Sequence, residues 1–187
     1  MTDQSTVTEA PATAADGSGA APLSQERRDL LELLRIRRFF LRQTARELTD
    51  EQASTASTVS ALTVAGLIKH VAATEATWAR FIVEGPSAFP ALNEATFAAR
   101  EQQFRMLDGE SLAGLLQAYD EVAAHTDDLV TTVDLDSAHP LPPAPWFEPG
   151  AVRTARQALM HIATETAQHA GHADIIREAI DGAKTMG

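Results

Sequence analysis

Histidine and glutamate side chains are concentrated near the carboxyl end of the chain, at spacings suited to metal binding. The cluster consists of His161, Glu165, His169 and His172, which fall within twelve residues. On a helix with about 100° per residue, the last three lie about 40°, 80° and 20° from the first, so all four share one narrow face. The spacing therefore predicts a polar strip along one face of a helix.

Such a strip can hold a metal ion if a second helix supplies a further ligand. Burying a carboxylate beside imidazoles costs on the order of several kcal/mol unless these groups are paired or bind a cation. Glu165 and His169 are four residues apart, so both can reach one ion, and His70 lies at the margin of the apolar face of another predicted helix. Two His and one Glu with an open position are typical of catalytic zinc sites. The alternatives are a buried hydrogen-bonded network without metal and a partly solvated end of the bundle.

Four long helices are predicted to position these residues. Apolar residues at three- and four-residue steps predict helices over about 24–48, 62–84, 111–133 and 152–180. A short helix capped by Asn93 is predicted to run to Arg105. Residues 134–150 contain five of the nine prolines, which predicts a long loop before the last helix. The predicted fold is all-α, a four-helix bundle with this proline-rich loop.

The amino-terminal segment differs in composition from the rest. Residues 1–23 are rich in Thr, Ala, Ser, Gly and Pro, which predicts a disordered tail, and residues 24–187 are expected to form one domain. The tail has no Lys, Arg or apolar block, so we expect no secretory signal and a cytoplasmic location.

The composition excludes several classes of function. The chain has 15 Lys and Arg against 26 Asp and Glu, a net charge of −11, which disfavours nucleic acid and anionic membranes as partners. It has no run of about 18 apolar residues, so no spanning helix is expected. The chain has no Cys, which leaves no disulfide, thiolate ligand or cysteine nucleophile. Any thiol chemistry would use the thiol of a substrate.

Two segments resemble the DinB superfamily: GLIKHVAATE at 66–75 and ETAQHAGHADIIREAIDG at 165–182. Within it, the chain is similar to the branch that includes mycothiol S-transferases and the metal-binding domain of mycothiol-dependent maleylpyruvate isomerase. The resemblance implies a DinB-like bundle with a divalent ion, most often zinc, held by His70, Glu165 and His169. Many relatives have Gln where this chain has His172, which we expect to take up a thiol proton or orient a substrate. Because the isomerases carry an additional carboxyl-terminal domain, isomerase activity is not expected.

The function that we expect is a metal-dependent transferase, which joins mycothiol or a similar small thiol to an electrophilic small molecule. A divalent cation favours the thiolate form of a thiol, which suits a protein without Cys. Trp146 and Phe147 in the proline-rich loop are expected either to cover a pocket as part of its wall or to plug the end of the bundle. The alternatives are a hydrolase that uses metal-activated water and a non-catalytic metal-binding bundle with a stress-response role. A homodimer is compatible with the sequence.

Overall fold

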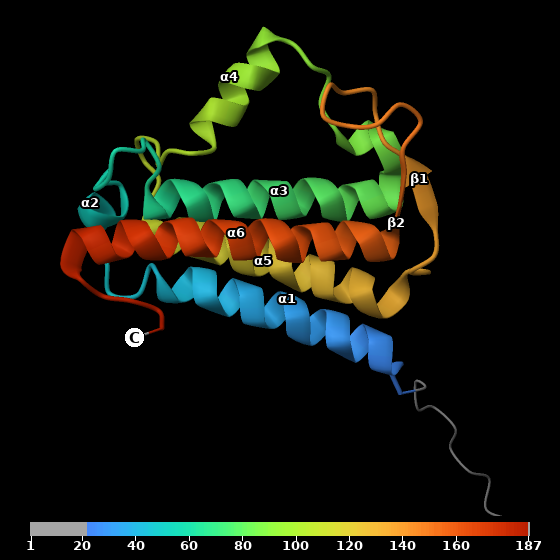
Figure 1. Ribbon diagram of the computed structural model, residues 1–187, viewed down its shortest axis with the longest axis horizontal. Helices are drawn as coiled ribbons and strands as arrows, with labels where there is room; N and C mark the ends of the chain where they lie inside the picture. The colour runs from blue at the N-terminus through green and yellow to red at the C-terminus, as the bar shows by residue number, and fades with distance from the viewer. Residues whose placement is uncertain (1–21, 187) are drawn as a thin grey trace, which may run out of the picture.

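The long helices form a bundle in the computed structural model, which describes residues 22–186. Four of them lie side by side (Figure 1): α1 (Gln25–Gln43), α3 (Val64–Glu84), α5 (Leu112–Thr132) and α6 (Ala155–Asp181). The connections hold the shorter α2 (Asp50–Ala53), η1 (Gly85–Ala88) and α4 (Glu94–Gln102). The predicted helical bundle is confirmed. The predicted disordered tail falls, except for its last two positions, outside the described residues.

Side-chain caps fix where the long helices begin. Ser24, Thr63, Ser111 and Thr154 each accept a hydrogen bond from the backbone N–H three residues ahead, which satisfies one donor that the helix cannot pair. Asn93 caps α4 in the same way, as predicted. The first helix ends at Gln43, before the predicted residue 48, because the chain then turns sharply and Glu47 has a positive φ of 63°.

A short hairpin replaces the predicted start of the last helix. Strand β1 (Ala138–Pro140) pairs antiparallel with β2 (Val152–Thr154), and the helix begins only at Ala155. The Leu141 N–H donates to the Ala151 carbonyl at 2.8 Å, so residues 141–151 form a loop that is closed at its base. Figure 1 shows this loop reaching over the end of α3, toward the connection that carries α4.

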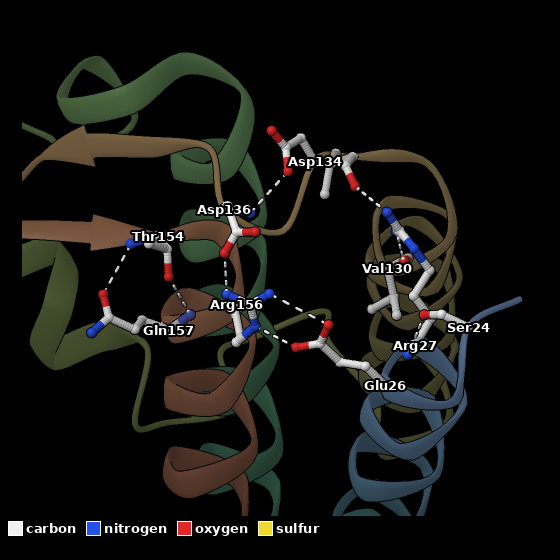
Figure 2. A network of polar contacts seen from close by, with 10 residues as sticks. Ser24, Glu26, Arg27, Val130, Asp134, Asp136, Thr154, Arg156 and Gln157 are labelled. Carbon is white, nitrogen blue, oxygen red and sulfur yellow. Dashed lines mark hydrogen bonds and ion pairs between the residues drawn. The ribbon is translucent and has the colours of Figure 1, made fainter.

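Polar contacts join the elements at the end of the bundle where α6 begins (Figure 2). Arg27 of α1 donates to two backbone carbonyl groups at the end of α5, and Arg156 of α6 pairs with both Glu26 and Asp136. These contacts connect the first helix to the base of the proline-rich loop. They therefore hold in place the chain segments at the base of that loop.

The core consists of two apolar clusters along the bundle, with a polar layer between them. Leu34, Phe81 and Ile162 represent the cluster nearer the hairpin, and Leu41 and Ile68 represent the other. Arg38 and Glu75 lie in the sequence between members of the two clusters, and both are buried. No helix within residues 22–186 has the length and apolar character needed to cross a membrane.

Candidate metal centre

The structure brings together the three residues that the sequence predicts as metal ligands. His70 of α3 faces Glu165 and His169 of α6, and each residue offers a ligand atom within 4.8 Å of the other two. The His169 Nε2 atom lies 3.5 Å from Oε2 of Glu165. The His70 and His169 rings are nearly perpendicular, at 85°, with centroids 4.9 Å apart. Two imidazoles and one carboxylate therefore converge from two helices.

The protonation states of these groups suit a divalent cation. Burial and the neighbouring His169 lower the pKa of His70 to about 4, so its ring is neutral at neutral pH. The buried Nδ1 of His70 has no hydrogen-bond partner in the described structure, which a ligand role would explain. The neighbouring His169 imidazole lowers the pKa of Glu165 and favours its carboxylate form. Neutral imidazole and carboxylate are the forms that bind zinc, so the residues present fit such an ion.

An aromatic ring stacks on one face of the His70 imidazole. Phe104, which follows α4, stacks on the imidazole with centroids 4.0 Å apart and planes at 23°. The backbone of Phe104 passes so close to α3 that a Cβ atom on Gly66 would lie 1.9 Å from the Phe104 carbonyl oxygen. Gly66 is therefore needed for the segment that packs on His70.

Replacing Gly66 with alanine should displace Phe104 from His70 and destabilise the protein. Because backbone rather than a flexible side chain meets the added methyl group, we expect a loss of about 1–3 kcal/mol in the free energy of unfolding, measured by urea denaturation. Gly171→Ala is the control, since a methyl group there meets no atom within 4 Å, and it should stabilise α6 by about 0.5–1 kcal/mol. Equal stability of the two variants would show that the close approach at Gly66 is unimportant.

His161 and His172 lie beside the three converging residues. The His161 Nε2 atom is 3.6 Å from Oε1 of Glu165, and the His161 ring also contacts Trp78. His172 is exposed and lines neither of the two cavities that adjoin the site. Its Nδ1 atom lies 3.4 Å from Nδ1 of His169. His172 therefore lies next to His169 but outside both cavities.

A cavity of about 460 Å³ opens beside His70 and Glu165. Its walls are mainly apolar and come from α3, α6, the segment before α4, α4 itself and the proline-rich loop. Trp146 and Phe147 of that loop line it, so of the two roles expected from the sequence they have that of a pocket wall. Trp78, which its helical position predicts as a core residue, is buried and also lines the cavity. The size is suited to a small organic molecule.

Arg100 of α4 lines this cavity and a second one of about 240 Å³ that shares His70 and Trp78, a position that the sequence pattern does not indicate. No residue of α4 is buried, so no core position of this helix marks its place against the bundle. Phe104 is missed for a similar reason. Arg100 and Phe104 lie at the site because the connection between α3 and α5 carries them there.

Comparisons with known proteins agree with this architecture. The model of the family described as Mycothiol-S-transferase matches residues 29–182. The fold is similar to the crystal structure of a conserved protein from Enterococcus faecalis, with a TM-score of 0.62 and 15% identity, over 83% of this chain and 97% of that chain. No curated protein matches the sequence. The family match runs from within α1 to the end of α6. It confirms the resemblance first indicated at residues 66–75 and 165–182. The chain belongs to the mycothiol S-transferase family.

Proposed function

We propose that the protein is an enzyme that transfers a small thiol of the mycothiol type to an electrophilic small molecule, at a divalent cation held by His70, Glu165 and His169. The observation that carries the proposal is the apolar cavity that opens directly onto His70 and Glu165. Zinc is the ion that this donor set suits best. Family membership supports the thiol, and we take the cytoplasm as the location of the reaction.

The residues of the site have separate tasks in this reaction. When bound, a divalent cation supplies positive charge that favours a thiolate at neutral pH. Glu165 offsets only one of the two charges, so the site stays positive toward an arriving sulfur. Trp146 and Phe147 line the cavity and exclude water from the electrophile. The sulfur forms a bond to the electrophilic carbon, the leaving group departs with its electron pair, and the thiol proton passes to solvent.

His172 is proposed to position His169 rather than to touch the substrate. A hydrogen bond between the two Nδ1 atoms would fix the His169 ring, with Nε2 directed toward Glu165. Partners of this kind commonly orient histidine ligands in metal sites. A general acid or base would need access to the cavity, which His172 does not line.

The test is conjugation of monochlorobimane with mycothiol by purified, zinc-replete protein. A free thiol with a pKa of about 8.5 is only about 3% ionised at pH 7, so ionisation together with orientation in the cavity should raise the rate at least about tenfold over thiol alone. The same protein without thiol is the control and should leave the bimane unchanged. Consumption of the electrophile without thiol would identify a hydrolase instead. A rate no higher than that of thiol alone, across several electrophiles, would contradict the proposal.

A further inference from the structure

The cavity contains one positively charged side chain, although the protein is strongly acidic. The net charge is −11, yet among the described residues that line the 460 Å³ cavity Arg100 is the only Lys or Arg. The one carboxylate in the lining is Glu165, which lies against His161 and His169. The cavity therefore offers a free cation at one position and a metal-binding cluster at another.

Arg100 is exposed, and no charged group among residues 22–186 accounts for its position. Among residues 22–186, its guanidinium group forms no ion pair and donates no side-chain hydrogen bond. Its guanidinium carbon lies 5.9 Å from the centre of the Trp146 ring. The charge also contributes to the low pKa of His70, so it acts within the same space. Its donors are available to a ligand.

Aromatic rings continue the wall on which Arg100 lies. Trp146 contacts Phe147, Phe147 contacts Phe89, and Phe89 contacts Trp78, with centroids 6.1, 6.4 and 5.2 Å apart. All four line the cavity. Such a wall suits a flat apolar body, and a guanidinium fork binds a carboxylate through two parallel hydrogen bonds. Together they fit an aromatic molecule with an anionic group.

We propose that Arg100 binds a carboxylate of the electrophile, so that the preferred substrates are aromatic electrophiles with an acidic group. This inference rests on the proposed function and names its substrate class. The electrophile lies along the aromatic wall with its carboxylate on Arg100, and its reacting carbon faces the end of the cavity formed by His70 and Glu165. The sulfur reaches it from that end.

Two electrophiles that differ mainly in one charge test the proposal. With 4-chloro-3-nitrobenzoate, the thiolate sulfur bonds to the ring carbon, chloride leaves with the bonding electrons, and the thiol proton goes to buffer. Its amide, 4-chloro-3-nitrobenzamide, reacts in the same way without the charge. After division by the rate with thiol alone, native protein should favour the benzoate in kcat/KM by about tenfold to a hundredfold.

Arg100→Gln should remove this preference. The kcat/KM for the benzoate should fall, whereas the kcat/KM for the benzamide should change by less than about twofold. Arg100→Lys should keep part of it, since a point charge replaces the fork. The matched control is Arg105→Gln, which removes one positive charge from the same connection outside the cavity and should change neither substrate. A variant Arg100→Gln that raises only the KM for the thiol would overturn the proposal and assign Arg100 to the thiol.

A binding measurement separates this inference from the proposed function. Both tryptophans of the chain line the cavity, so their fluorescence reports binding of unreactive 3-nitrobenzoate and 3-nitrobenzamide without any thiol. Tighter binding of the benzoate, lost in Arg100→Gln, supports the role of Arg100 even if no conjugation occurs, in which case only the transferase function fails. Equal affinity of native protein for both ligands overturns the role of Arg100, whatever the turnover.

Discussion

Replacing His70 or His169 with alanine should reduce the metal content of the purified protein from about one ion per chain to a small fraction of that. Each substitution removes one of three protein ligands, and loss even of an outer hydrogen-bond partner costs about 10–100-fold in metal affinity. A greater loss is therefore expected here. Elemental analysis after dialysis against metal-free buffer measures the outcome, and circular dichroism confirms that the variants remain helical.

Two further histidines make this prediction specific. His125→Ala, on the exposed face of α5, should leave the metal content unchanged. His172→Ala should weaken the affinity by about tenfold through the loss of the partner of His169, without emptying the site at saturating zinc. Equal metal content in the His70, His169 and His125 variants would mean that the ion binds elsewhere or is adventitious.

The largest loss of stability should follow from breaking the buried ion pair between Arg38 and Glu75. Glu75 has no exposed surface, and Arg38 donates to both of its carboxylate oxygens and to Asp127. Arg38→Leu leaves the Glu75 carboxylate buried without its cation, which should cost about 3–5 kcal/mol in the free energy of unfolding. Urea denaturation measures this loss as a lower midpoint.

The double variant Arg38→Met with Glu75→Leu should recover much of that stability, because no uncompensated charge then remains in the core. Arg35→Ala is the matched control on the same helix. Its pair with Glu32 is exposed, so the cost should be about 0–1 kcal/mol. If Arg38→Leu were no more harmful than Arg35→Ala, the polar layer would contribute little to the fold.

Local periodicity explains why the helices and the three converging residues could be predicted. Glu165 and His169 share a face as soon as the last segment is helical, and that depends on nearby residues alone. His70 required one further assumption, that its helix faces the last one. The apolar stripes supported this assumption, and the contact between α3 and α6 bears it out.

Features set by tertiary structure were not predictable in the same way. Strands of three residues such as Val152–Thr154 are too short to show an alternating pattern, so the sequence predicts helix there instead. Arg100 lies on a helix with no buried residue, and only the course of its connection brings it to the cavity. His172 shares a helix face with His169, yet the periodicity does not show that it lies outside the cavity.

The most direct measurement is the rate of mycothiol conjugation to monochlorobimane as zinc is titrated into metal-stripped protein. The rate should start at the level of thiol alone, rise in proportion to bound zinc and level off at one ion per chain. His169→Ala protein should stay at the level of thiol alone over the same range of added zinc. A stripped protein as active as the loaded one, or a rate that does not depend on the thiol, would contradict a metal-dependent thiol transfer at His70, Glu165 and His169.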